Sequence, residues 1–135
     1  MGLFKNLFSD IIETDRVKRD EEDKLWNLIE NMDLSNKQIE YGIWNVFYGA
    51  KKYRIISPSG DYILINAPEP RVCINYYEIC YYKKTSDYYP SHEFVSSIHI
   101  GCGLYNYEKE AIVKRLLLDL ERRKHMGNID AMDRF

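Results

Sequence analysis

The sequence predicts a single α+β domain over residues 1–135, with N-terminal helices, a four-stranded antiparallel meander and one long C-terminal helix. Two observations predict this class. Apolar residues recur every three or four positions near both ends of the chain, and short β-prone runs separated by turn residues fill its middle. Helices and strands that are segregated along a chain are typical of α+β domains.

The N-terminal segment is expected to be helical because six large apolar residues fall on one helical face. A charged stretch, 13–24, separates them from a second apolar stripe over 25–32, so the segment forms either one bent helix or two short ones. We expect the first stripe to be buried against the domain or against a second subunit. Its residues are Leu3, Phe4, Leu7, Phe8, Ile11 and Ile12.

Residues 36–48 carry two competing signals. Ser35 and Gln38 have the spacing of a capping box, and the apolar residues that follow fit a helical face. Tyr41, Trp44 and Tyr48 carry bulky aromatic side chains that suit a strand. The capping signal favours a helix, and a strand remains the alternative.

Four β-prone runs follow, at 53–56, 62–65, 72–82 and 94–100. The first two are joined by Ser-Pro-Ser-Gly-Asp, which predicts a hairpin, and a loop over 83–92 precedes the last run. The C-terminal helix is indicated by an apolar stripe over 112–120, with Asn106 before it as a cap and Gly127 after it as a left-handed stop.

Composition excludes several classes of protein. Nineteen basic and twenty-one acidic residues leave a formal charge of −2, so binding to duplex nucleic acid is not expected. No apolar run reaches the roughly 20 residues that span a bilayer, and the N-terminus lacks the order of a signal peptide. Three cysteines are an odd number for a disulfide scaffold. We therefore expect a cytoplasmic protein without membrane contact, in the host cytoplasm if a virus encodes it.

The sequence carries no recognisable catalytic or metal-binding motif. His99 and Cys102 are the only close pair of metal-ligand types, which is too few for a zinc site. Ser96, Ser97 and His92 lie nearby, but no Gly-x-Ser-x-Gly elbow surrounds a serine. We expect no enzyme activity, no metal and no cofactor. The turn Gly101, Cys102, Gly103 before a helix is the best candidate for binding a small anion.

Tyrosine is the most unusual feature, with twelve residues in the chain and a dense group between 76 and 89. Exposed tyrosine is a preferred interface residue because it buries a large area at low entropic cost. Counting apolar positions on the strand 72–82 places Tyr77 and Tyr81 on its exposed side. The predicted partner-binding surface is Tyr77, Tyr81, Lys83, Lys84, Tyr88 and Tyr89.

These observations favour a small non-enzymatic binding protein that occludes a macromolecular partner, most simply a protein. Inhibitors and immunity proteins of phages and mobile elements, including anti-defence proteins, are of this kind, and the richness in Ile, Asn, Lys and Tyr indicates AT-rich coding. The first alternative is a binder of a small molecule or signalling nucleotide that acts as a sponge, and the second is a single-stranded nucleic-acid binder. A homodimer is compatible with each.

Overall fold

A computed structural model of the chain describes residues 2–45, 50–67, 77–100 and 107–131; for residues 2–11, 43–45 and 50 it describes the backbone alone. The order along the chain is helix α1 (Gly2–Glu30), a 3-10 turn (Leu34–Asn36), strands β1 (Gln38–Asn45), β2 (Ala50–Ile56), β3 (Tyr62–Ala67), β4 (Tyr77–Lys84) and β5 (His92–Ile100), helix α2 (Tyr107–His125) and strand β6 (Asp130–Ala131). The class is α+β, as predicted.

The sheet is larger than the predicted four-stranded meander. Its strand order is β5-β4-β3-β2-β1-β6, and every described pair is antiparallel except the short parallel pairing of β6 with β1. The four predicted strands form its β2 to β5 part, and the hairpin between β2 and β3 is confirmed. The predicted sheet therefore matches four adjacent strands, β5 to β2, and lacks the two strands β1 and β6 at the other edge.

Residues 38–45 form strand β1, so the helix predicted over 36–48 is wrong in its described part. Ile39 lies opposite Ile55 and Tyr41 opposite Tyr53 in an antiparallel ladder. Alternate residues of β1 therefore reach the core, and the Tyr41 and Tyr53 rings lie 5.1 Å apart between their centroids. Pairing along a whole neighbouring strand outweighs the local capping signal. Residues 46–48 lie outside the described part of the chain.

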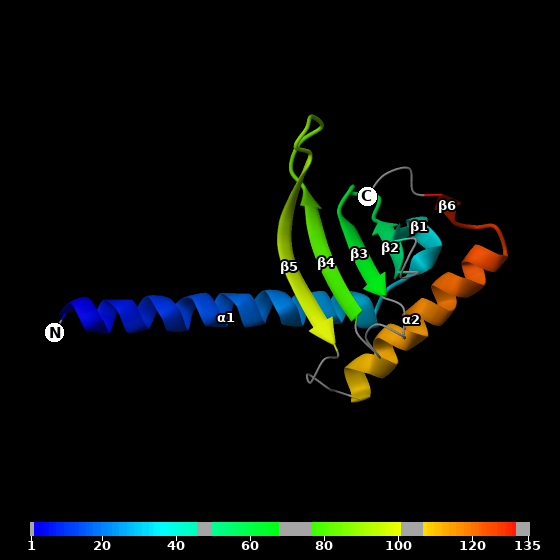
Figure 1. Cartoon of the computed structure of the whole chain (residues 1–135). Helices are drawn as coiled ribbons and strands as arrows, with labels where there is room; N and C mark the ends of the chain where they lie inside the picture. Colours follow the sequence, from blue (N-terminus) through cyan, green and yellow to red (C-terminus); the bar gives the residue numbers. More distant parts are fainter. Residues whose placement is uncertain (1, 46–49, 68–76, 101–106, 132–135) are drawn as a thin grey trace.

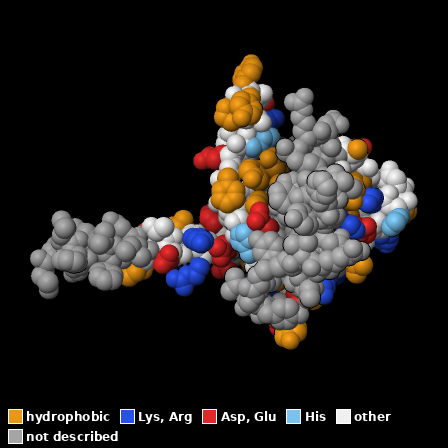
Figure 2. All heavy atoms as spheres, viewed as in Figure 1, with side chains coloured by type: hydrophobic (Ala, Val, Ile, Leu, Met, Phe, Trp, Pro, Cys, Tyr) orange, Lys and Arg blue, Asp and Glu red, His pale blue; other side chains and the backbone are white. Residues whose placement is uncertain are grey.

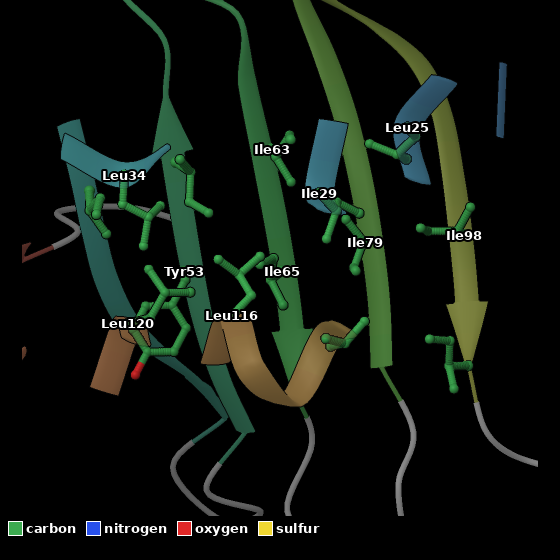
Figure 3. Close-up of a cluster of buried hydrophobic side chains, with 14 residues drawn as sticks. Leu25, Ile29, Leu34, Tyr53, Ile63, Ile65, Ile79, Ile98, Leu116 and Leu120 are labelled. Carbon is green, nitrogen blue, oxygen red and sulfur yellow. The ribbon is translucent and has the colours of Figure 1, made fainter. Parts of the chain in front are cut away.

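Both helices cover one face of the sheet. A row of directly opposed residues, Tyr53, Ile65, Ile79 and Ile98, crosses four strands at the centre of that face, and each member is buried. Leu25 and Ile29 from α1 and Val113, Leu116 and Leu120 from α2 pack on it, as Figure 3 shows for most of them. The described core cluster thus lies between the two helices and one side of the sheet.

The N-terminal segment is one helix, and much of it lies away from this core. Figure 1 shows α1 crossing the sheet and continuing well past the edge strand β5. Residues 12–20 are exposed, with Ile12 at 63%. Burial of the first apolar stripe against the domain is thus contradicted for Ile12. Burial against a second subunit stays a prediction, and the side chains of residues 3–11 lie outside the described set. The C-terminal helix is confirmed, and Gly127 has the expected positive φ of 77°.

Truncation of the core is expected to be costly, and α2 offers a matched pair of leucines to measure it. Leu120 is fully buried, whereas Leu118 is 71% exposed. Leu120→Ala should lower the free energy of unfolding by about 2–5 kcal/mol, because it removes a packed side chain and leaves a cavity. Leu118→Ala should change it by about 0.5 kcal/mol or less. Urea denaturation measures both, and equal losses in the two variants would contradict the burial described.

Candidate functional site

Among the described residues, no helix or strand packs on the second face of the sheet. Because side chains alternate along a strand, the residues between the core positions point away from both helices. We call this side the open face. On β3 it carries Tyr62, Leu64 and Asn66, and on β4 it carries Glu78, Cys80 and Tyr82.

Aromatic rings form a continuous row across three strands of the open face. The Tyr62 and Tyr82 rings are stacked, with centroids 4.8 Å apart and planes inclined by 24°. Phe94 meets Tyr82 edge-on at 5.8 Å, and His92 lies 4.8 Å from Tyr62. These four residues are named the aromatic row. Phe94, at the edge of the sheet, is 53% exposed.

The guanidinium of Arg54 closes the other end of the row. Its carbon lies 5.1 Å from the centroid of the Tyr62 ring, and its Nη1 lies 3.3 Å from a carboxylate oxygen of Glu40. Tyr62 therefore has Tyr82 on one side and Arg54 on the other. Burial raises the pKa of both tyrosines, so that their hydroxyls stay neutral. The ring of Tyr62 is thus covered on both faces, and the hydroxyls of Tyr62 and Tyr82 are neutral polar groups beside it.

The tip of the hairpin between β4 and β5, residues 85–91, extends the aromatic surface. Tyr88 is 82% exposed and Tyr89 is 98% exposed. Figure 2 shows hydrophobic side chains at this tip and again over the adjacent strands. Two large aromatics at a nearly fully exposed tip gain nothing from folding, so their presence needs another explanation.

The hairpin is held to the neighbouring β2–β3 turn by polar contacts. Asp61 accepts a hydrogen bond of 2.8 Å from the backbone N–H of Lys84. Nε2 of His92 lies 2.8 Å from the carbonyl oxygen of Gly60, and Nδ1 lies 2.8 Å from Oγ of Ser91. Since a carbonyl only accepts, Nε2 donates to Gly60, and Nδ1 shares a second hydrogen bond with the serine hydroxyl. Both ring nitrogens of His92 are thus used to position the hairpin.

A hollow of about 490 Å³ lies where the aromatic row meets the β2–β3 turn. Arg54 and Lys84 bring positive charge to it, but the ammonium of Lys84 lies 3.1 Å from a carboxylate oxygen of Asp87. Arg54 is likewise paired with Glu40. The hollow is therefore polar without a strong net charge. Its lining is Arg54, Ile56, Gly60, Tyr62, Lys84, Ser86, Asp87, Ser91 and His92.

The structure corrects the orientation predicted for β4. Tyr77 and Tyr81 face the helices and pack against the core on either side of the buried Ile79. The outward direction predicted for them is wrong, and Tyr82 takes that direction. The hydroxyl of Tyr81 lies 3.3 Å from a carboxylate oxygen of Asp61. Of the predicted surface, Lys83, Lys84, Tyr88 and Tyr89 are exposed.

The residues considered for catalysis are not brought into one site. Ser96 is buried on the helix-covered face, whereas Ser97 and His99 lie on the open face. Nδ1 of His99 lies 3.7 Å from a carboxylate oxygen of Glu78. Among the described residues no three potential metal ligands cluster. The anion candidate Gly101, Cys102 and Gly103 lies outside the part of the chain that the structure describes.

Sequence reasoning missed Arg54, Tyr62, Tyr82 and Phe94 as surface residues. They come from four strands and meet only through the register, in which Tyr62 lies opposite Tyr82, and Tyr82 opposite Phe94. The available signal was the alternation within 62–65, where Ile63 and Ile65 are buried in the core and Tyr62 therefore lies on the opposite face.

Neither helix, within the described residues, is apolar enough over a sufficient length to cross a membrane.

Cys80 lies on the open face of the sheet but is itself buried, and this burial can be tested chemically. Burial, helped by the hydrogen bond to Glu78, raises the pKa of its thiol to about 12. An unperturbed thiol has a pKa of about 8.5. Cys80 should therefore resist iodoacetamide at pH 8 in the folded protein and react once urea unfolds it, because the thiolate is the nucleophile. Peptide mass spectrometry identifies the alkylated residue, and rapid labelling of folded Cys80 would contradict its burial.

No protein-family model matches this chain, and neither a curated protein nor a solved structure matches it significantly. We therefore infer the function from the chemistry of the protein's surfaces.

Proposed function

We propose that the protein is a non-enzymatic binding protein that docks on a protein partner through the hairpin tip and the aromatic row, and acts by occluding the partner's surface. The observation that carries this proposal is the near-complete exposure of Tyr88 and Tyr89 at the end of an anchored hairpin. Aromatic residues dominate the energetic centres of protein interfaces. Exposed aromatics that contribute little to folding are well suited to that role.

The anchoring of the hairpin adds to the argument. A loop that is already ordered loses less conformational entropy on binding than a free one. Asp61 and His92 fix the two sides of the hairpin to the β2–β3 turn. The tyrosines are thus presented on a supported projection, while the aromatic row beneath offers a broader, flatter surface.

At the aromatic row, charge and ring geometry favour a protein over single-stranded nucleic acid. Base stacking requires a free ring face beside unpaired positive charge. The faces of Tyr62 are occupied by Tyr82 and Arg54, and both Arg54 and Lys84 are paired with carboxylates. Ring edges with neutral hydroxyls match the mixed polar and apolar character of a protein interface.

A second candidate is a small-molecule or nucleotide binder that uses the hollow beside the aromatic row. Its volume of about 490 Å³ is within the usual range of about 300–1,000 Å³ for ligand sites. The pairing of its cations weighs against a phosphate ligand. Native mass spectrometry of protein purified from its own host would reveal a retained small ligand and so favour this alternative over the first.

Substitution of the tyrosines at the tip should weaken partner binding without changing the stability of the fold. Truncation of an interface anchor costs about 2 kcal/mol or more, roughly thirtyfold in affinity. Tyr88→Ala and Tyr89→Ala should each weaken partner binding to that extent while the melting temperature stays unchanged, because neither side chain is buried. Titration calorimetry with the partner captured from host lysate, together with thermal melting, measures both effects.

The matched control is Tyr107→Ala, a tyrosine that is 78% exposed at the start of α2, away from the hairpin. It should leave affinity unchanged. Equal affinity in all three variants would show that the tip is not part of the interface and would favour the hollow as the binding site.

A further inference from the structure

We propose that two copies of the chain form a symmetric dimer by antiparallel packing of their α1 helices. The proposal is independent of the partner-binding function, because it uses the helix-covered side of the molecule and leaves the open face free. It starts from the part of α1 that extends past β5 with no cover among the described residues (Figure 1).

The proposed contact is a stripe of four residues along one flank of α1. Val17, Glu21, Lys24 and Leu28 follow one another at intervals of four, three and four. That alternation keeps residues on one side of a helix and is the spacing of a coiled-coil seam. We call these residues the flank stripe. Val17 is 49% exposed and Leu28 is 44% exposed, so the stripe has two apolar ends and a charged centre.

The flank stripe is complementary to itself when the second helix runs in the opposite direction. A twofold axis between residues 22 and 23 places Val17 opposite Leu28 of the partner subunit. The same axis places Glu21 opposite the partner's Lys24, and the symmetric contacts repeat both pairings. Apolar residues thus meet apolar residues, and each carboxylate meets an ammonium group. A parallel pair would instead set like charges against each other.

The stripe lies on the flank that the domain leaves available. On the opposite flank α2 approaches α1, where the ammonium of Lys109 lies 5.0 Å from the centroid of the Trp26 ring. At about 3.6 residues per turn, Trp26 and Leu28 point in nearly opposite directions around the helix. Lys24 and Glu21 already form an ion pair of 3.2 Å within one chain, and their side chains can exchange to the partner without moving the backbone.

A second feature favours a second copy as the occupant. β5 is the last strand of the described sheet on the side where α1 leaves it. Long edge strands usually carry lysine or proline against further pairing, and β5, from His92 to Ile100, carries neither. Antiparallel packing of α1 would bring the two β5 edges next to each other. It would also carry the start of each helix, with its apolar sequence, onto the other domain.

Charge reversal tests the pairing directly. Glu21→Lys leaves two lysines at the centre of the stripe, and Lys24→Glu leaves two glutamates. Each variant alone should be monomeric, because like charges face each other across the axis. An equimolar mixture should form a heterodimer, because every lysine then meets a glutamate. Sedimentation equilibrium of the full chain measures the mass against the 16.1 kDa of one chain.

Two further variants complete the test. Val17→Asp should dissociate the wild-type dimer without lowering the helix content measured by circular dichroism, because its side chain contacts solvent in the single chain. Arg19→Glu, an exposed charge reversal outside the stripe, should leave the dimer intact.

Several outcomes would overturn the proposal. One is a wild-type chain that remains monomeric at about 100 µM, where a dimer with a Kd near 1 µM would have formed. Another is a mixture of the two charge variants that stays monomeric although the wild type dimerises. A monomeric chain that sediments with anionic phosphatidylserine vesicles would assign the α1 segment to a membrane surface instead.

Discussion

The register across strands β2 to β5 is the constraint on which the rest of this structure depends. Tyr53, Ile65, Ile79 and Ile98 lie directly opposite one another and form the row on which both helices pack. Because side chains alternate strictly along a strand, this row also decides what faces the other way. A slip of one residue in β3 or β4 would bury Tyr62 or Tyr82 and expose an isoleucine. The core and the proposed binding surface are thus set by a single alignment.

The predictable parts of the fold were those in which local pattern and tertiary environment agree. The β-prone runs of β2 and β3 lie on either side of a Pro-Ser-Gly turn, and α2 has a continuous apolar stripe. Residues 38–45 were predicted incorrectly because Ile39 and Ile43 satisfy a helical period, whereas pairing with β2 selects Ile39 and Tyr41 instead. Strand β6 has only two residues and depends on β1 being a strand. No local sequence pattern predicts such a pairing.

The candidate site was less predictable than the fold for a related reason. Tyrosine suits both a core and an interface, so a count of apolar positions did not separate the two sides of β4. That count included Val72 and Ile74, which precede the start of β4 at Tyr77. Within β4 the decisive residue is Ile79. Its side chain is buried, and Tyr77 and Tyr81 lie on the same face of the strand. The exposure of Tyr88 and Tyr89 at the hairpin tip was predicted correctly because no strand alternation applies to them, and their contact with a partner stays a prediction.

The two proposals place their contacts on different sides of the sheet, and this separation has a physical consequence. The flank stripe belongs to α1 on the covered side, whereas the aromatic row lies on the open face. A symmetric dimer would therefore present two hairpin tips without blocking either. When both tips reach sites on one assembly, the second contact forms at a high effective concentration and overall avidity exceeds the affinity of one tip. Dimerisation would thus strengthen occlusion of a multivalent partner without adding any new contact to the interface.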